Sequence, residues 1–217
     1  MKLLPAITCF LAAVISGGYS LICDTCTNAN GDSCTGAAQT CDASQDTCIF
    51  TLTETRTPKE KTQSFAKSCG KSKDCKLLSS MSNEQVKIMS TSKCCNTDRC
   101  TPEPVSVPRR DEEANGIVCP ACYTSSTEEC TGQGTVQCKG VENQCIKYGM
   151  PVATGADAPY AIRGCANKIM CDTKGKLAFP SITAELKKFE CSHGSHLQHN
   201  FSFSALIGLL LLLKLLS

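Results

Sequence analysis

The sequence predicts a small, disulfide-rich, all-β fold that occurs twice in the chain. Three observations lead to this prediction. Nineteen of the 217 residues are cysteine and none is tryptophan, a composition typical of secreted domains that disulfides stabilise in place of a large apolar core. The cysteine pattern repeats along the chain, and short runs rich in β-branched residues lie between the cysteines. A large α/β enzyme is therefore excluded.

Residues 1–20 are predicted to be a signal peptide. Lys2 precedes an apolar run over 3–15, and Gly18 and Ser20 supply small residues where a signal peptidase cleaves. The proline and glycines inside the run argue against the alternative, a buried N-terminal helix. We expect the mature chain to start at Leu21.

An internal repeat fixes the number of domains. Eight cysteines of the first copy are followed 96 or 97 residues later by eight of the second, and Cys34-Thr35-Gly36 corresponds to Cys130-Thr131-Gly132. The first set is Cys23, Cys26, Cys34, Cys41, Cys48, Cys69, Cys75 and Cys94, and the second is Cys119, Cys122, Cys130, Cys138, Cys145, Cys165, Cys171 and Cys191. This duplication predicts a first domain over 21–100 and a second over 119–191.

The segment 101–118 is predicted to be the linker between the copies. It contains three prolines, the dibasic pair Arg109-Arg110 and an acidic run, which favour an extended, solvated chain. A protease site at Arg109-Arg110 is the alternative, and an inert linker is favoured.

The cysteine count indicates disulfides. Cys9 leaves with the signal peptide, and ten plus eight cysteines remain, so no thiol is left over. A zinc ribbon also uses C-x-x-C pairs such as Cys23/Cys26 and Cys119/Cys122, but it does not need eight or ten cysteines per copy. A thioredoxin-like redox pair needs a βαβ context, which the sequence lacks. We therefore expect no metal and no cofactor.

Two long hairpins and one weak helical pattern are visible in the sequence. The residues between Cys48 and Cys69 include a β-branched run with a turn candidate over 58–61, and the segment 145–165 is its counterpart in the second copy. The apolar residues of 181–189 recur at helical spacing after a proline.

Charge excludes nucleic acid as a partner. The formal net charge is only +2, with ten basic and nine acidic residues in 23–100 and eight and seven in 119–191. Nucleic-acid binders normally carry a strong basic excess on one domain or face.

The C-terminal end matches a signal for a lipid anchor. A polar spacer over 192–204 precedes the leucine-rich tail 205–217, which is shorter than the ~20 apolar residues that span a bilayer. Small residues at Ser192, Gly194 and Ser195 are candidates for attachment of a GPI anchor in the outer leaflet. Lys214 inside the tail is unusual for such a signal, and a merely hydrophobic C-terminus on a secreted protein is the alternative.

No catalytic residue is expected. All three histidines, His193, His196 and His199, lie in the spacer, so a nucleophile in either domain lacks a histidine base. The spacer histidines have a spacing that a metal site could use. A metal site also needs ligands held by a folded second shell, and a solvated spacer between the last cysteine and the tail is the favoured interpretation. Adjacent carboxylates at Glu128-Glu129 point to opposite faces of a strand, and a solvated turn is the plainer interpretation.

The pattern that begins Cys23-x-x-Cys26 and ends Cys94-Cys95-Asn96-Thr97-Asp98-Arg99-Cys100 resembles the lymphocyte-antigen-six/urokinase-receptor domain, whose three-finger fold projects three β-hairpins from a knot of disulfides. Both copies share the resemblance. It implies the following disulfides: Cys23–Cys48, Cys26–Cys34, Cys41–Cys69, Cys75–Cys94, Cys95–Cys100, Cys119–Cys145, Cys122–Cys130, Cys138–Cys165 and Cys171–Cys191.

This sequence departs from the family pattern at two positions. Thr101 stands where the family places an asparagine after the final cysteine, so a hydrogen bond that ties this end into the knot is expected to be missing. Ser192 stands where a second cysteine is expected after Cys191, so the second domain is predicted to lack the last disulfide and its small loop.

Within that family the chain looks most like the gamma-type phospholipase A2 inhibitors, through segments such as Cys119-Pro120-Ala121-Cys122 and Ile162-Arg163-Gly164-Cys165. The resemblance implies a secreted protein that blocks a secretory phospholipase A2, often as an oligomer. The candidate contacts on the second fingers are Arg56, Lys59, Lys61, Tyr148 and Tyr160. The alternative for each of them is an ordinary exposed residue on a solvated hairpin with no role in binding. A GPI-anchored surface receptor or adhesion protein is the main alternative, and a toxin-like modulator of a channel or receptor is a third.

Overall fold

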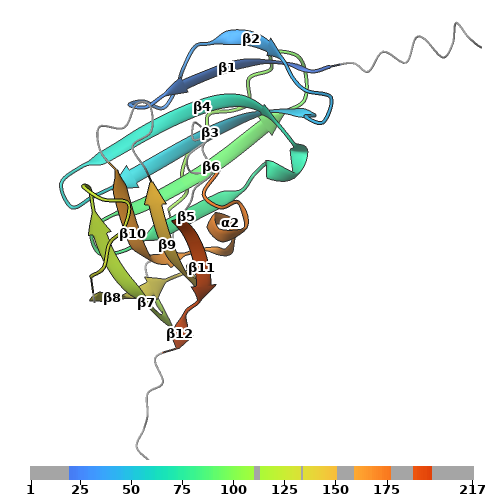
Figure 1. Ribbon diagram of the computed structural model, residues 1–217. Coiled ribbons are helices and arrows are strands. Elements are labelled where there is room, and N and C mark those ends of the chain that lie inside the picture. The colour runs from blue at the N-terminus through green and yellow to red at the C-terminus, as the bar shows by residue number, and fades with distance from the viewer. Residues whose placement is uncertain (1–19, 110–112, 133, 151–158, 177–187, 197–217) are drawn as a thin grey trace, which may run out of the picture.

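The fold consists almost entirely of antiparallel strands (Figure 1). The structure, a computed structural model, describes residues 20–109, 113–132, 134–150, 159–176 and 188–196. The elements of the first half are β1 (Ile22–Asn28), β2 (Ala37–Thr40), β3 (Thr47–Arg56), β4 (Lys61–Gly70), the 3-10 turn η1 (Ser72–Asp74), β5 (Leu78–Ser82) and β6 (Lys87–Cys95). Those of the second half are β7 (Ala114–Thr124), β8 (Gly134–Lys139), β9 (Gln144–Met150), β10 (Tyr160–Ala166), α2 (Lys168–Asp172), β11 (Lys188–His193) and β12 (Ser195–His196).

Each half forms a set of paired strands that corresponds to three fingers. In the first half these are β1–β2, β3–β4 and β5–β6. In the second half β7 pairs with β8, β9 pairs with β10, and β11 pairs with the outer side of β9. The hairpins expected over 48–69 and 145–165 are therefore present, although the tip of the second, 151–158, lies outside the described residues.

β3 is the central strand of the first half. Every residue of Thr47–Thr53 is buried, and β3 pairs with β4 on one side and β6 on the other. Its β-branched and aromatic residues fit this position because they pack well on a pleated surface covered by neighbours. Phe50 and Leu52 of β3 pack with Phe65 of β4 in the core of the first half.

Nine disulfides tie the strands together at the base of the fingers. Their Cα–Cα separations run from 5.3 Å to 6.1 Å, which is the usual range. They join Cys23–Cys48, Cys26–Cys34, Cys41–Cys69, Cys75–Cys94, Cys95–Cys100, Cys119–Cys145, Cys122–Cys130, Cys138–Cys165 and Cys171–Cys191. These are the pairings that the family resemblance implies.

The C-terminal end of the first half is tied to β1 by residues that precede Thr101. Asp98 accepts a hydrogen bond from the backbone N–H of Ile22 at 2.9 Å, and the Arg99 N–H donates to the Ile22 carbonyl at 2.7 Å. Arg99 also pairs with Asp24 at 2.9 Å. Asp98 and Arg99 therefore make a tie at this end that does not require an asparagine at position 101.

The two halves share one continuous sheet. β5 of the first half pairs with β10 of the second, so the strand order runs β11-β9-β10-β5-β6-β3-β4-β1-β2 (Figure 1). A single apolar cluster spans this junction: Met81, Val86 and Ile88 from the first half pack with Ile146, Tyr148, Met150, Ile162, Ala166 and Met170 from the second. The domains therefore form one packed unit rather than two beads on a linker.

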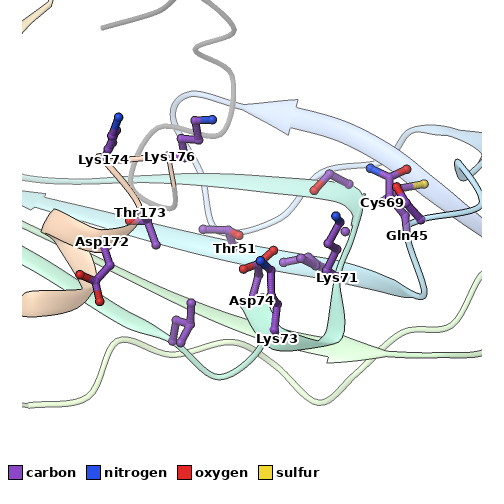
Figure 2. A pocket seen from close by; sticks show the side chains of 15 residues that line it. Gln45, Thr51, Cys69, Lys71, Lys73, Asp74, Asp172, Thr173, Lys174 and Lys176 are labelled. Atoms are coloured by element: carbon purple, nitrogen blue, oxygen red, sulfur yellow. The ribbon is translucent and has the colours of Figure 1, made fainter. Parts of the chain in front are cut away.

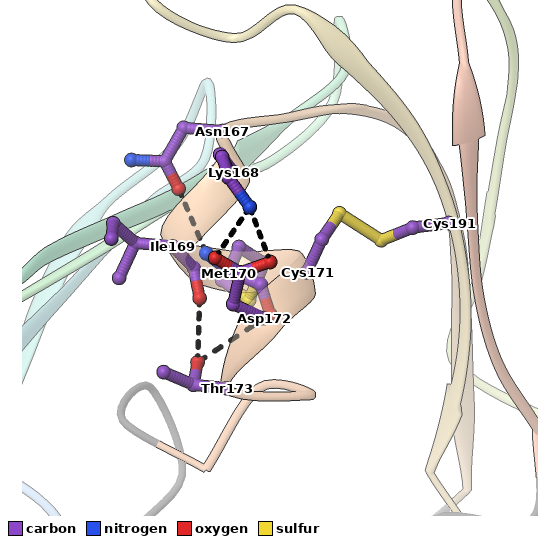
Figure 3. A network of polar contacts seen from close by, with 8 residues as sticks. All are labelled: Asn167, Lys168, Ile169, Met170, Cys171, Asp172, Thr173 and Cys191. Carbon is purple, nitrogen blue, oxygen red and sulfur yellow. Dashed lines mark hydrogen bonds and ion pairs between the residues drawn. A yellow bond between two sulfur atoms is a disulfide. The ribbon is translucent and has the colours of Figure 1, made fainter.

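Asn167 is the polar centre of the junction. Its side-chain Oδ1 accepts hydrogen bonds from the backbone N–H groups of Ser80 (3.1 Å) and Met170 (3.0 Å), and its Nδ2 donates to the Leu78 carbonyl at 2.7 Å. The bond to Met170 caps the start of α2 (Figure 3). One buried side chain thus starts a helix and binds the edge of the other domain.

α2 is also held at its far end. Cys171 forms its disulfide with Cys191 of β11, and Thr173 Oγ1 donates to the Ile169 carbonyl at 2.8 Å (Figure 3). On its exposed side Lys168 pairs with Asp172 at 2.8 Å. The sequence pattern pointed instead to a helix over 181–189; Lys188 and Phe189 belong to β11, and 181–187 lie outside the described residues. No helix in the described part of the chain is long and apolar enough to cross a membrane.

Candidate functional site

A tight turn closes the β3–β4 hairpin at its tip. Thr57 organises it, because its hydroxyl accepts hydrogen bonds from the N–H groups of Lys59 (3.3 Å) and Glu60 (3.2 Å), and its N–H donates to the Glu60 carbonyl at 2.9 Å. Lys59 is exposed on this turn. The sequence predicted a turn over 58–61, and the turn in the structure spans 57–60, one residue earlier.

Glu54, which precedes the turn in β3, binds two cationic side chains. Its side chain is only 3% exposed and pairs with both Arg56 and Lys61, whose side chains are half exposed. Gln63 donates a further hydrogen bond to Glu54 at 3.3 Å. Burial by itself raises the pKa of Glu54, but the hydrogen bonds from Lys61 and Arg56 and their charges outweigh it, so the pKa is lowered overall. Two cations are thereby fixed beside the turn.

Glu54 predicts a specific pH dependence of stability. A carboxyl whose pKa is lower in the folded than in the unfolded chain stabilises the fold above its unfolded pKa, and this stabilisation is lost as the pH falls through the folded value. The wild-type free energy of unfolding should therefore decrease on acidification below about pH 4.5. Glu54→Gln should be less stable at pH 7 and lose less stability over the same acid range.

Denaturant unfolding with disulfides intact, at pH values from 7 to 3, measures this difference. Glu60→Gln is the matched control, because Glu60 lies exposed on the same turn and its side chain makes no ion pair with a described residue. Equal acid sensitivity in wild type and Glu54→Gln would contradict the assignment.

The tip of the β5–β6 hairpin lies along the same edge of the sheet. Arg56 is opposite Lys87, Lys87 is opposite Ser82, and Ser82 is opposite Cys165 of the second half. The tips of both hairpins therefore face the same direction, and the second of them contacts the second domain.

Asn83 makes that contact. Its side-chain Oδ1 accepts from Gln85 N and Val86 N within the turn, at 2.8 Å and 2.9 Å. Its Nδ2 donates across the junction to the carbonyls of Cys122 (3.0 Å) and Arg163 (3.2 Å). Asn83 thus fixes the β5–β6 turn against β7 and β10.

Tyr123 lies beside this turn. It is 40% exposed on β7 and lines a groove of about 280 Å³ together with Asn83, Glu84 and Gln85. Among the described residues, Tyr123 and Val141 are the exposed large hydrophobic side chains. An exposed tyrosine next to a concave surface is the kind of side chain that dominates protein interfaces. Sequence reasoning missed Tyr123.

The structure places Tyr148 and Tyr160 differently from the sequence expectation. Tyr148 is 0% exposed in the core shared by the domains, with its ring centroid 5.9 Å from those of Tyr160 and Phe189. Tyr160 is partly buried against the same core, and burial raises the pKa of both tyrosines. Tyr148 presents no surface to a partner, because β9 turns this face inward, so Tyr148 is not part of the candidate binding surface.

These features define one candidate binding surface, which we call the tip surface: Arg56, Lys59 and Lys61, the β5–β6 turn with Glu84 and Gln85, and Tyr123. β5 lies two strand spacings from β3 through β6, which is about 10 Å, and β5 and β7 pair with the same edge of β10, at Cys165 and at Ile162. A standard interface covers ~800 Å² per partner, or about 30 Å across. One protein partner can therefore contact both ends of the tip surface.

The carboxylate of Glu129 and the clustered cysteines, which sequence analysis considered for chemistry, are held in structural contacts. Glu129 pairs with Lys188 at 3.0 Å, and this hydrogen bond with its charge lowers the pKa of Glu129. Within the described residues, the two groups of close sulfur atoms are Cys23, Cys41, Cys69 and Cys119, Cys138, Cys165. All six are disulfide-bonded, so they offer no thiolate to a metal.

The proposed anchor positions lie next to the last strands. Ser192 is in β11 opposite Cys145, and Ser195 is in β12 opposite Val118. Gly194 lies between them, where an added Cβ would come within 2.0 Å of the Ile117 Cγ2. Two of the spacer histidines lie here as well, His193 in β11 and His196 in β12, whereas His199 lies outside the described residues.

Comparison with known proteins matches both halves of the chain. A family model described as phospholipase A2 inhibitor matches residues 21–102, and one described as u-PAR/Ly-6 domain matches residues 115–199. A phospholipase A2 inhibitor of the gamma type from Laticauda semifasciata is 33% identical over 180 residues, which cover 79% of this chain and 96% of that protein.

Two further relatives and one solved structure show similar coverage. A gamma-type phospholipase A2 inhibitor from Gloydius brevicaudus siniticus is 32% identical over 80% of this chain and 88% of its own length. Phospholipase A2 inhibitor NAI of Notechis ater is 30% identical over 75% and 82%. The crystal structure of mouse TEX101 aligns with 82% of this chain and 98% of its own at 20% identity and a TM-score of 0.33, too low to support an argument about function.

Proposed function

Because the chain belongs to the family of gamma-type phospholipase A2 inhibitors, built from u-PAR/Ly-6 domains, we propose that it is an extracellular binding protein that inhibits a secretory phospholipase A2. The relatives that support this proposal are named as phospholipase A2 inhibitors and match over most of their length. The inhibitor acts by occupying surface on the enzyme and carries out no reaction of its own.

The tip surface is the proposed contact. Its backbone is fixed by disulfides, by the Thr57 turn and by Asn83, so little conformational entropy is lost on docking. Two of its cations, Arg56 and Lys61, are held in place by Glu54, and Tyr123 supplies an aromatic anchor next to a groove. This combination of a preorganised charged rim and an exposed aromatic side chain is the observation that carries the proposal.

Inhibition of a panel of secretory phospholipases A2 by the purified, oxidised chain tests the function. We expect at least one enzyme to be inhibited, and reduction with alkylation to abolish the effect because the fingers unfold without their disulfides. An absence of binding and inhibition across the panel would remove this function and leave the fold unaffected.

Lys59→Glu tests the basic end of the tip surface. Reversing an exposed charge at the rim of an interface changes the association rate more than the dissociation rate. We expect the association rate constant for the inhibited enzyme to decrease about two- to tenfold at low salt, and this decrease to be smaller at high salt. Kinetic binding measurements at two salt concentrations report this. Lys76→Glu, an exposed lysine far from the turn in the chain, is the control, and an equal change in both variants would contradict the assignment.

A GPI-anchored receptor or adhesion protein is the second candidate function, favoured by the apolar tail 205–217 after a polar spacer. Treating expressing cells with a phosphatidylinositol-specific phospholipase C distinguishes the two. Release of the protein from the cell surface would support the anchor, and full recovery in the medium without treatment would support free secretion. Light scattering of the soluble protein tests the proposed homo-oligomer.

A further inference from the structure

A second concave surface lies on the other side of the domain junction from the tip surface. It is a groove of about 680 Å³ between η1, with the end of β4, and the loop that follows α2 (Figure 2). Its volume is within the range of ~300–1,000 Å³ that is usual for ligand sites. Both domains contribute to it, so it exists only because β5 and β10 join them.

Four lysines line this groove. Lys71 and Lys73 come from the first domain, and Lys174 and Lys176 come from the second (Figure 2). All four are exposed, and none forms an ion pair or a side-chain hydrogen bond with another residue in the described part of the chain. The chain as a whole carries a net charge of only +2, so this concentration is local.

The carboxylates of the groove do not balance these charges. Asp74 and Asp172 are the acidic residues that line it, and Asp172 is already paired with Lys168, which lies outside the groove, at 2.8 Å. Asp46 lies nearby, and the hydrogen bonds it accepts from the Ser72 hydroxyl (2.8 Å) and N–H (2.7 Å), with the charge of Lys71, lower its pKa. It therefore stays ionised and, with Asp74, offsets two of the four lysine charges. The groove therefore carries an excess of positive charge that two domains supply together.

We propose that this groove binds a sulfated polysaccharide chain of the extracellular matrix. Lysines on flexible stems are point charges suited to a flexible polyanion, whereas planar bidentate recognition of a single carboxylate or phosphate favours arginine. A membrane surface fits less well, because the groove is concave and the described large hydrophobic side chains that are exposed, Tyr123 and Val141, do not line it. The proposal rests on the extracellular location but not on inhibition of a phospholipase.

Heparin serves as the probe, with chemically desulfated heparin as its control. The full oxidised chain should bind immobilised heparin at about 50 mM salt, bind the desulfated polymer at least tenfold more weakly, and elute as salt screens the charges. Lys71→Gln, Lys73→Gln, Lys174→Gln and Lys176→Gln together should weaken binding by about tenfold or more, since each exposed charge contributes only a small increment.

Matched variants make the test specific. Lys59→Gln with Arg109→Gln removes two exposed positive charges outside the groove and should leave heparin binding within about twofold of wild type. Either pair of groove lysines alone, Lys71/Lys73 or Lys174/Lys176, should weaken binding, because the site needs both domains. The groove variants should keep wild-type inhibition in the phospholipase assay, so the two proposals can fail separately.

Three results would overturn the proposal. These are an absence of heparin binding by the wild-type chain at low salt, an equal loss in the variant with substitutions outside the groove, and binding to phosphatidylserine-containing vesicles that exceeds heparin binding and depends on the same four lysines. The last result would assign the groove to a lipid surface.

Discussion

Replacing Asn167 with alanine is expected to lower the free energy of unfolding by about 3 kcal/mol. The substitution removes three hydrogen bonds from a buried side chain and leaves the N–H groups of Ser80 and Met170 and the carbonyl of Leu78 without these partners. Each such loss in a buried site costs about 1 kcal/mol or more. Denaturant or thermal unfolding with intact disulfides measures the effect, which corresponds to a decrease in Tm of about 10 °C in a chain of this size.

Asn115 provides a matched control within one domain. Its side chain also makes three hydrogen bonds, to the carbonyls of Gly140 and Glu142 and from the Ile117 N–H, each at 3.0 Å. Asn115→Ala should destabilise the second domain without loosening the junction. Amide hydrogen exchange distinguishes the variants: exchange at Ser80 should accelerate in Asn167→Ala and stay unchanged in Asn115→Ala. A Tm within about 1 °C of wild type for Asn167→Ala would show that the junction does not depend on this side chain.

Much of the fold within each half could be predicted from local sequence signals. The cysteine repeat identified two copies, and the β-branched run after Cys48 together with Pro58 identified the central hairpin, because strand and turn preferences act over a few residues. The connectivity of the disulfides came from the family resemblance, since spacing alone does not select one pairing among many.

The junction between the domains could not be predicted in this way. The pairing of β5 with β10 depends on which strand edges remain free after each domain has folded, and neither edge carries a local signal. Asn167 likewise looks like any polar residue before a short helix. Its role follows only from the position of Leu78 and Ser80, nearly ninety positions away in the chain.

The candidate contacts show where a usable signal was overlooked. Ile146, Tyr148 and Met150 alternate along β9, and residues two apart on a strand share one face, so Tyr148 could have been assigned to the core with its two apolar neighbours. Tyr123 carries no comparable signal. It shares a face of β7 with Ile117 and Cys119, both buried, and becomes exposed only because the strand continues past the core.

Truncating Tyr123 to alanine should weaken inhibition of the target phospholipase A2 by about 30-fold, the effect of losing roughly 2 kcal/mol from an aromatic anchor. The inhibition constant against an enzyme identified in the panel measures this. Tyr123→Phe keeps the ring and should retain inhibition within about threefold if packing rather than the hydroxyl supplies the energy.

Val141→Ala is the matched control for this variant. Val141 is 55% exposed, lies between β8 and β9, and is outside the groove that Tyr123 lines, so its truncation should change inhibition less than about twofold. Because Tyr123 is exposed at the end of its strand, its loss should leave the Tm nearly unchanged, and a decrease in inhibition then reports on binding. Wild-type inhibition by Tyr123→Ala together with a loss in Lys59→Glu would confine the contact to the β3–β4 turn. Unchanged inhibition in both variants would show that the enzyme contacts a different face of the inhibitor.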